Sequence, residues 1–575
     1  MLMIEDILRT AIRHAMGTLL IDGDQIILEH PTEFTHGDYS TNIALTLAKR
    51  EKTNPRDLAQ KIVEMIKQAH GDHHEYVSDI EVAGAGFINF YLKPKFFSET
   101  VAHVLENEKD FGKNKILSGK KIMFEYTQPN PFKPFHIGHL MSNAIGESLS
   151  RIFEWSGTHV VRANYQGDVG PHVAKAIYIL LREPVSKELY TPSQQATYIG
   201  ECYAKGSQAY DDDVEAKKEI DEINRKVYEK SDAKINEIYD WGRRVTLEAF
   251  EEIYKMLGTN FDYYFFESEV AKLGEKIVEE HIGEIFETSD GATVFKAEKF
   301  DPKLHTRVFI NSKGLPTYET KELGLTKTKF EKEKLDLSVV TTAVEQAEYM
   351  KVVEKAVSLM YPEIAQKMKH ITHGMMRFAT GKMSSRKGNV VTGESLLSDS
   401  RAVIFEKIQD REFEEHEKEH LAQVVGVAAL KYSILRQAIG GDIIYDFEKS
   451  ISFEGDSGPY LQYTYTRIQS LLKKGIDRGI IPNTTLPEGW VTTDVEKILY
   501  RFPEMNERAF KEYAPHYVAT YLIELARAFS TWYGNTKIAD ENDLHSPYKM
   551  ALTEAVGVAL RNGLWLLGIE APHKM

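Results

Sequence analysis

Residues 121–165 read KIMFEYTQPNPFKPFHIGHLMSNAIGESLSRIFEWSGTHVVRANY, and the pattern of this stretch decides the fold. KIMFEY is a short segment typical of a strand, TQPNPFKPF is a loop broken by prolines, and HIGHLMSNAIGESLSRIFEWSG predicts a helix that ends at Gly157. A second apolar run, THVVRANY, follows. A strand, a helix and a strand at this spacing predict a βαβ unit in a parallel sheet, whose ligand crevice lies at the carboxyl ends of the strands.

The residues before this stretch predict a compact α/β unit that ends near residue 112. Apolar helical segments lead there to the strand-like IEVAGAGFINFYL at residues 80–92. The GAG in that run is interpreted as a tight turn between strands. A dinucleotide-binding loop would need a third glycine where Asn89 stands, and a helix after it.

The residues after this stretch predict a helical insertion and a helical end. Residues 185–260 carry many Glu/Lys pairs at i,i+4 spacing, which predicts helices that lie over the sheet. Strand-like segments return at residues 306–314 and 335–344, and from about residue 400 nearly everything is helical. The expected fold is therefore α/β and multidomain, with a Rossmann-type parallel sheet and an all-helical C-terminal part.

Composition excludes some classes of protein and leaves others open. The chain has 575 residues, which predicts about three or four domains. No stretch approaches the roughly 18 apolar residues of a membrane span. Glu5 and Asp6 in the first helix argue against a signal peptide, and the lone Cys202 favours a reducing cytoplasm. The net charge of −15 leaves a nucleic-acid partner open, because such binding depends on local basic patches.

The start of the predicted helix after KIMFEY is a candidate phosphate site. Pro134 precedes two histidines, His136 and His139, that are three residues apart. Imidazole donors beside the free N–H groups of a helix N-terminus suit a phosphate whose negative charge grows in a transition state. Gly138 between the histidines would let an adenine ring approach the backbone. The alternative is that these histidines only cap the helix.

A second candidate lies at residues 381–389, GKMSSRKGN. A loop with glycines near both ends and three cations suits a pyrophosphate leaving group, although it could equally be a solvated basic turn. In this order on a parallel sheet, the two segments resemble the HIGH and KMSKS signatures of class I aminoacyl-tRNA synthetases. The second departs from its signature at Ser385 and Arg386. Arginine-specific members commonly lack the lysine at this place and carry one just before HIGH, where Lys133 stands here.

Further segments resemble the arginine-specific family along nearly the whole chain. They are residues 36–39 and 86–90 of an N-terminal domain, 125–130 of a substrate strand, 167–170, 317–322, 454–463 of an anticodon-binding domain, and the C-terminal run to Met575. Val169 and Glu322 replace the usual tryptophan and aspartate. The resemblance implies an N-terminal tRNA-binding domain at 1–112, a catalytic domain at 113–395 with its insertion at about 185–260, a helical stem at 396–450 and an anticodon-binding domain at 451–575.

The resemblance implies a ligase that forms arginyl-adenylate from L-arginine and ATP and then charges tRNA(Arg). The implied catalytic residues are His136, His139, Lys382 and Lys133, and the ATP-binding residues are Pro134, His136, Gly138, His139, Lys382, Met383 and Ser384. The implied arginine-binding residues are Glu125, Asn130, Glu267, Tyr318, Glu322 and Gln346. Those implied for tRNA are Phe87, Asn89, Tyr460, Tyr533 and Met575. ATP is expected with Mg²⁺ as a substrate complex, without bound zinc or a membrane partner, in a cytoplasmic monomer.

Several alternatives remain beside this hypothesis. The HExxH pattern at residues 416–420 matches a zinc-protease helix, but it is charged on every face, which favours a solvated helix. Glu322 could pair with Lys327 rather than with a ligand. The chain could also charge another amino acid, or be a non-catalytic tRNA-binding relative. The implied acid-rich pocket for the guanidinium and the GKMSSRKGN segment argue against another amino acid. The intact His136 and His139, with Lys382, argue against a non-catalytic relative.

Overall fold

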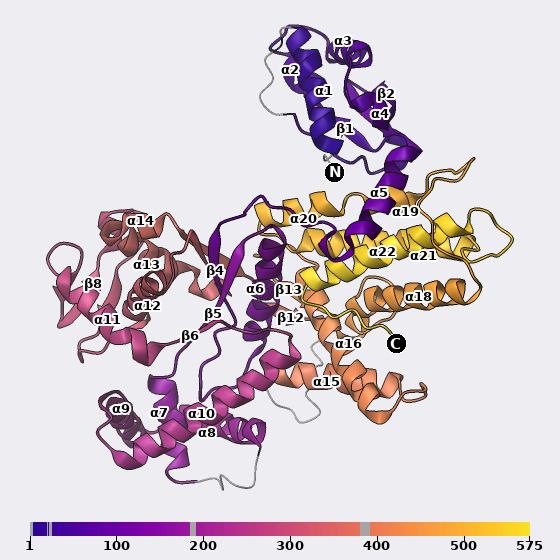
Figure 1. Ribbon diagram of the computed structural model, residues 1–575. Coiled ribbons are helices and arrows are strands. Elements are labelled where there is room, and N and C mark those ends of the chain that lie inside the picture. Colours follow the sequence, from indigo (N-terminus) through magenta and orange to yellow (C-terminus); the bar gives the residue numbers. More distant parts are fainter. Residues whose placement is uncertain (1–3, 20, 22–25, 184–190, 380–391) are drawn as a thin grey trace.

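The computed structural model describes residues 4–19, 21, 26–183, 191–379 and 392–575. Its N-terminal unit combines helices α1 (Ile4–Thr18), α2 (Ile43–Ala48) and α3 (Pro55–Gln68) with an antiparallel sheet of order β1-β3-β2. The strands are β1 (Tyr39–Thr41), β2 (Val77–Ala83) and β3 (Phe87–Leu92). Gly86, at φ 135°, lies in the turn between β2 and β3, so the predicted turn is confirmed. Helix α5 (Pro94–Asn107) joins this unit to the rest of the molecule (Figure 1).

The central sheet has five parallel strands in the order β11-β10-β4-β5-β6. They are β4 (Lys121–Glu125), β5 (His159–Gln166), β6 (Tyr263–Phe266), β10 (Leu337–Ala343) and β11 (Met368–His373). Helix α6 (Ile137–Trp155) connects β4 to β5, which confirms the predicted βαβ unit. The chain adds β5 and β6 on one side of β4, and β10 and β11 on the other. The strand order therefore reverses between β4 and β10, where such sheets bind their ligands.

The insertion helices are α8 (Pro192–Asp212), α9 (Val214–Glu229) and α10 (Ala233–Met256), and they pack with α7 (Pro171–Leu180). The prediction that they lie over the sheet is wrong. Their cluster contains Phe132 and Val169, which follow β4 and β5, so the helices lie at the carboxyl ends of these strands (Figure 1). Only the last turns of α10 join the main core, through Phe250 and Tyr254. The insertion thus borders the ligand crevice.

The strand-like segments at 306–314 and 335–344 belong to different sheets. The second is β10 of the parallel sheet, whereas the first is β9 (Arg307–Ile310) of a small antiparallel sheet with β7 (Glu287–Ser289) and β8 (Ala292–Phe295). Helix α12 (Tyr318–Lys332) follows β9 and packs on α11 (Glu267–Glu280) and α13 (Ala347–Met360). This layer carries residues 317–322 to the central sheet.

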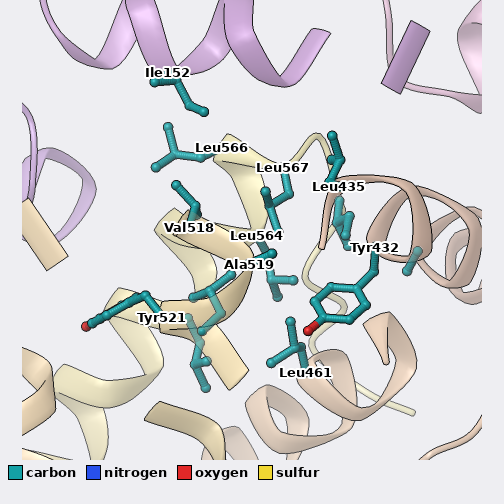
Figure 2. Packing of buried hydrophobic residues seen from close by; sticks show 14 of the residues in the cluster. Ile152, Tyr432, Leu435, Leu461, Val518, Ala519, Tyr521, Leu564, Leu566 and Leu567 are labelled. Carbon is teal, nitrogen blue, oxygen red and sulfur yellow. The ribbon is translucent and has the colours of Figure 1, made fainter. Parts of the chain in front are cut away.

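The C-terminal part is a helix bundle, as predicted. Its helices are α15 (Gly393–Lys407), α16 (Glu415–Leu435), α18 (Gly458–Asp477), α19 (Asp494–Leu499), α20 (Phe502–Lys511), α21 (His516–Asn535) and α22 (Ser546–Leu566). Figure 2 shows Ile152 of α6 facing Leu566 at the end of α22, and Tyr432 of α16 beside Leu461 of α18. One core therefore runs from α6 into the bundle. None of the helices described is both long enough and apolar enough to cross a membrane.

Candidate active site

A pocket of about 170 Å³ opens at the carboxyl ends of the parallel strands. We call it the carboxyl-edge pocket. Residues from both halves of the predicted site line it: His136, Gly138, His139, Asn130, Glu267, Tyr318, Glu322 and Gln346. The structure thus brings together eight predicted site residues that are spread along the sequence from Asn130 to Gln346.

The two histidines at the start of α6 contact each other. The backbone N–H of His136 donates to Nδ1 of His139 (3.1 Å), and the two rings stack with centroids 3.4 Å apart. Because Nδ1 of His139 accepts, its Nε2 carries the hydrogen of the neutral ring. Desolvation and nearby Lys133 lower the pKa of His136 to about 4, and burial keeps the pKa of His139 well below its usual value. Both rings are neutral near pH 7, and Nε2 of His139 is a hydrogen-bond donor.

The loop between β4 and α6 has an unusual backbone. Thr127, Gln128 and Phe132 have φ values of 78°, 56° and 66°, a region that residues other than glycine seldom adopt. The Thr127 N–H donates to Oγ of Ser142 (3.0 Å), and its hydroxyl accepts from the side chain of Asn143 (3.0 Å). Strained backbone of this kind clusters at ligand sites, where the surrounding contacts hold it in place.

Asn130 and Glu267 converge on Gly167. The Gly167 N–H donates to Oδ1 of Asn130 (2.8 Å), which leaves the amide nitrogen of Asn130 as the donor for a ligand. A Cβ atom on residue 167 would lie 2.8 Å from Asn130 Oδ1 and 3.0 Å from Glu267 Oε1. Only glycine therefore permits both side chains to come this close to the strand end.

Buried charges surround the arginine-binding residues that the resemblance implies. Glu267 forms an ion pair with Lys321 (2.6 Å), and Glu125 forms one with Lys329. Glu125 is 1% exposed and is not among the residues that line the pocket, but its Oε1 accepts from the side-chain amide of Gln128 (2.6 Å), which does line it. Burial and the nearby charge of Glu125 raise the pKa of Glu322 to about 8. Lys321 neutralises Glu267, and Lys329 neutralises Glu125. Glu322 is therefore the carboxylate in the pocket that is best placed to meet a new cation.

Glu322 does not take Lys327 as its partner. Lys327 pairs with Glu331 (3.5 Å), whereas Glu322 is 9% exposed and lines the pocket. Tyr318 is four residues earlier on α12 and lines the same pocket, so the two side chains share one face of the helix. The alternative that Glu322 pairs with Lys327 rather than facing the pocket is therefore wrong.

Sequence reasoning missed several polar residues that support the pocket. One of them is Lys329, which pairs with Glu125. Its position seven residues after Glu322 on α12 places both side chains on the same helix face, so the spacing could have indicated it. Asp168 was noted only as part of a segment. It is buried and accepts from the Ser268 N–H (2.9 Å), the Ser268 hydroxyl (2.7 Å) and Nε of Arg243 (2.9 Å). It thereby fixes the first turn of α11, where Glu267 begins the helix.

The remaining residues implied for ATP lie beside the pocket or beyond the described residues. The Lys133 ammonium nitrogen lies 5.4 Å from the centre of the Tyr203 ring. Pro134 is exposed on the loop before α6. Lys382, Met383 and Ser384 fall outside the described residues.

The residues implied for tRNA lie on three separate surfaces. Phe87 is 42% exposed on the N-terminal sheet. Asn89 is 5% exposed, and its side chain accepts a hydrogen bond from the Ser40 hydroxyl (2.7 Å), which joins β3 to β1. The Tyr460 hydroxyl lies 3.0 Å from that of Ser530, and Tyr533 stacks on Phe529 at the end of α21. Met575 packs against the cluster formed by α15 and α16.

The HExxH pattern at residues 416–420 lies on a solvent-exposed part of the molecule. His416 and His420 of the HExxH pattern are exposed on α16, as expected of a solvated helix. Within the part of the chain that the structure describes, no three His, Cys, Asp or Glu side chains form a group able to hold a metal ion.

Three family models match the sequence. The model described as "tRNA synthetases class I (R), catalytic domain" matches residues 100–447. "Arginyl tRNA synthetase N terminal domain" matches residues 3–92, and "DALR anticodon binding domain" matches residues 461–575.

The chain is also similar to named proteins over nearly its whole length. It is 31% identical to an arginine–tRNA ligase of Fusobacterium nucleatum over 556 residues, with 95% of this chain and 94% of the relative covered. It is 28% identical to one of Clostridium perfringens, with 97% of each chain covered. The solved Thermus thermophilus arginyl-tRNA synthetase has a TM-score of 0.79 at 22% identity and covers 100% of both chains, which shows a shared fold.

Proposed function

The chain belongs to the arginyl-tRNA synthetase family, and we propose that its carboxyl-edge pocket carries both steps of the arginine–tRNA ligase reaction. In the first step, a carboxylate oxygen of arginine attacks the α-phosphorus of ATP, and the bond to the leaving pyrophosphate breaks. In the second, a ribose hydroxyl of the terminal adenosine of tRNA(Arg) attacks the arginyl carbonyl carbon, and AMP leaves. The observation that carries this proposal is the convergence of two neutral histidines and a carboxylate-rich wall in one pocket.

The histidines act on the nucleotide. His139, neutral and protonated at Nε2, donates a hydrogen bond to the α-phosphate oxygens, where charge grows as the fifth bond to phosphorus forms. His136 lies against it and contributes a second imidazole at the pocket mouth. Lys133, together with Lys382 of the GKMSSRKGN segment, neutralises the departing pyrophosphate. The protein does no covalent chemistry, so positioning and charge stabilisation supply the rate.

The opposite wall selects arginine. A guanidinium group is planar, always charged and carries five N–H donors, so it needs at least one carboxylate within reach. Glu322 and Glu267 supply carboxylates, and Tyr318, in the first turn of α12, lines the pocket with them. Asn130 and Gln346 line the same pocket and would hold the α-amino and carboxylate end of arginine.

The tRNA is proposed to span the molecule. Phe87 would meet its outer corner from the N-terminal domain, and Tyr460, Tyr533 and Met575 would lie near its anticodon. ATP enters as its Mg²⁺ complex, since Mg²⁺ commonly binds through substrate phosphates and water. We propose that the enzyme works in the cytoplasm as a monomer, with the domain boundaries that the sequence predicts.

The test is arginine-dependent exchange of pyrophosphate into ATP, with tRNA(Arg) present and absent. Exchange with arginine and tRNA is expected, and exchange with arginine alone should be much slower because the altered GKMSSRKGN segment would need tRNA contact. The other nineteen amino acids separate the competing proposals. Exchange with another amino acid alone would assign a different specificity, and no exchange with any of them would indicate a non-catalytic relative.

A further inference from the structure

His373 lies at the nucleotide end of the carboxyl-edge pocket. It is the last residue of β11, it pairs in register with Ala343 of β10, and it lines the pocket together with His136 and His139. Glu267 begins directly after β6, at the other edge of the sheet. With strands about 4.8 Å apart, four spacings separate the two edges by roughly 19 Å. His136 and His139, which are proposed to meet the α-phosphate, line the pocket together with His373, so the proposed placement of the nucleotide brings its adenosine half to the His373 side.

The hydrogen-bonding state of His373 is fixed by its main chain. Nδ1 of the ring lies 2.8 Å from the carbonyl oxygen of Gly374. A carbonyl oxygen only accepts, so Nδ1 carries the hydrogen and Nε2 of the neutral ring is an acceptor. Burial lowers the pKa of His373, which keeps the ring neutral. Because Nδ1 turns back to the backbone, the edge that carries Nε2 reaches away from the strand.

Nε2 of His373 lacks a hydrogen-bond partner among the described residues, although the side chain is only 2% exposed. A buried acceptor without a partner is unfavourable, and native proteins seldom keep one unless a ligand satisfies it. The neighbouring Thr342 hydroxyl is already engaged with Nε2 of His370 (2.7 Å). The acceptor of His373 is therefore unpaired among the described residues, on a side chain that lines the pocket.

The segment after His373 is held by the helical part of the chain. A Cβ atom on Gly374 would lie 2.3 Å from the carbonyl oxygen of Gly441, so only glycine fits this contact. The Met375 N–H donates to Oδ1 of Asp442 (2.9 Å), and its carbonyl accepts from the Ile443 N–H (2.8 Å). These contacts hold the backbone from which the His373 ring projects.

We propose that Nε2 of His373 accepts a hydrogen bond from the exocyclic amine of the adenine base, and so makes His373 a residue that selects ATP among nucleoside triphosphates. This rests on the proposed placement of ATP in the pocket. The amine is the donor on the base that guanine and hypoxanthine replace by an oxygen at the same position. Such an oxygen would face the lone pair of Nε2, which disfavours those bases.

The test compares the full-length enzyme with the His373→Phe and His373→Gln variants in arginine-dependent pyrophosphate exchange, with tRNA present. The nucleotides are ATP, the triphosphate of purine riboside, which lacks the amine, and 2′- and 3′-deoxy-ATP. Loss of the amine should raise the KM of the parent enzyme about 3- to 10-fold, as expected for one neutral hydrogen bond. His373→Phe should raise the KM for ATP by a similar factor and leave the KM for the purine riboside nucleotide unchanged. His373→Gln, whose amide oxygen accepts, should recover part of the loss.

The outcomes separate this inference from the proposed function. If the parent enzyme gives no arginine-dependent exchange, the proposed function fails. If it does, and His373→Phe has the same KM for ATP as the parent, only the role of His373 fails. If His373→Phe erases the penalty for a deoxy nucleotide instead, the partner is a ribose hydroxyl and the assignment to the base is overturned. The KM for arginine and the melting temperature serve as controls and should not change.

Discussion

The side-chain nitrogen of Lys431 donates a hydrogen bond to the carbonyl oxygen of Gly568 (2.8 Å) and another to that of Leu257 (2.6 Å). Leu257 is the C-cap of α10 and Gly568 follows α22, so one fully buried side chain of α16 satisfies free carbonyl groups at the ends of two helices. Helix α10 belongs to the insertion beside the pocket, and α22 to the C-terminal bundle. Lys431 thus fastens the two parts to each other.

Lys431→Met should lower the free energy of unfolding by about 2–6 kcal/mol, because two buried carbonyl oxygens each lose a partner at roughly 1–3 kcal/mol. Urea denaturation followed by circular dichroism measures this. Lys449→Met is the matched control, since the Lys449 side chain is 84% exposed. A loss for Lys431→Met no larger than that of the control would mean that water replaces the lysine.

The stabilisation by Lys431 should also depend on pH. Burial and the nearby charge of Arg151 lower the pKa of Lys431 to about 7, against about 10.4 in an unfolded chain. Between these values the unfolded state binds more protons, so the stability of the parent rises with pH relative to Lys431→Met, by at most about 1.4 kcal/mol per unit. Denaturation curves at pH 7, 8 and 9 test this. A constant difference between the two proteins would show that the folded pKa is not depressed.

Asp168→Asn should weaken arginine binding without affecting ATP. The carboxylate of Asp168 holds the first turn of α11 through Ser268 and Arg243, and Glu267 begins that turn. Hydrogen bonds to a charged group are worth about 1.5–3 kcal/mol, so we expect the KM for arginine to rise on the order of 10-fold. Glu269→Gln, an exposed change on the same helix, is the control. An equal rise in the KM for ATP would indicate a general loss of structure.

The sequence predicted the βαβ unit, the N-terminal unit and the bundle because each depends on local periodicity. Its prediction that the insertion helices lie over the sheet is wrong, because charged faces show only which side of a helix is solvated. His136 and His139 were predicted from the local pattern at a helix start, whereas Glu267, directly after β6, was identified through the resemblance. Their supports were not, because ion pairs such as Glu125–Lys329 depend on which strands lie side by side. That order follows from long-range packing, which no short pattern encodes.

Glu322→Gln should reduce kcat/KM for arginine by roughly 30- to 5,000-fold. The guanidinium would then be desolvated without its counter-charge, which typically costs about 2–5 kcal/mol. Glu331→Gln is the matched control, because Glu331 lies on the same helix and only pairs with Lys327 at the surface. Lysine should remain a poor substrate of both variants. Charging of arginine by Glu322→Gln within about threefold of the parent would leave Glu267 as the carboxylate that meets the guanidinium.

The raised pKa of Glu322 predicts that arginine binding releases a proton. In the empty pocket burial raises this pKa to about 8, with Glu125 and Glu267 opposing ionisation and Lys329 and the Tyr349 hydroxyl favouring it. The guanidinium binds the ionised carboxylate, so below about pH 8 a proton must leave before the pair forms. The KM for arginine should therefore rise as the pH falls from 8 to 6, by up to about tenfold per unit. Glu322→Gln has no proton to lose there, so its KM should stay flat over the same range. Arginine titrations of both proteins at pH 6, 7 and 8 decide the matter: parallel curves would mean that Glu322 is already ionised in the empty pocket.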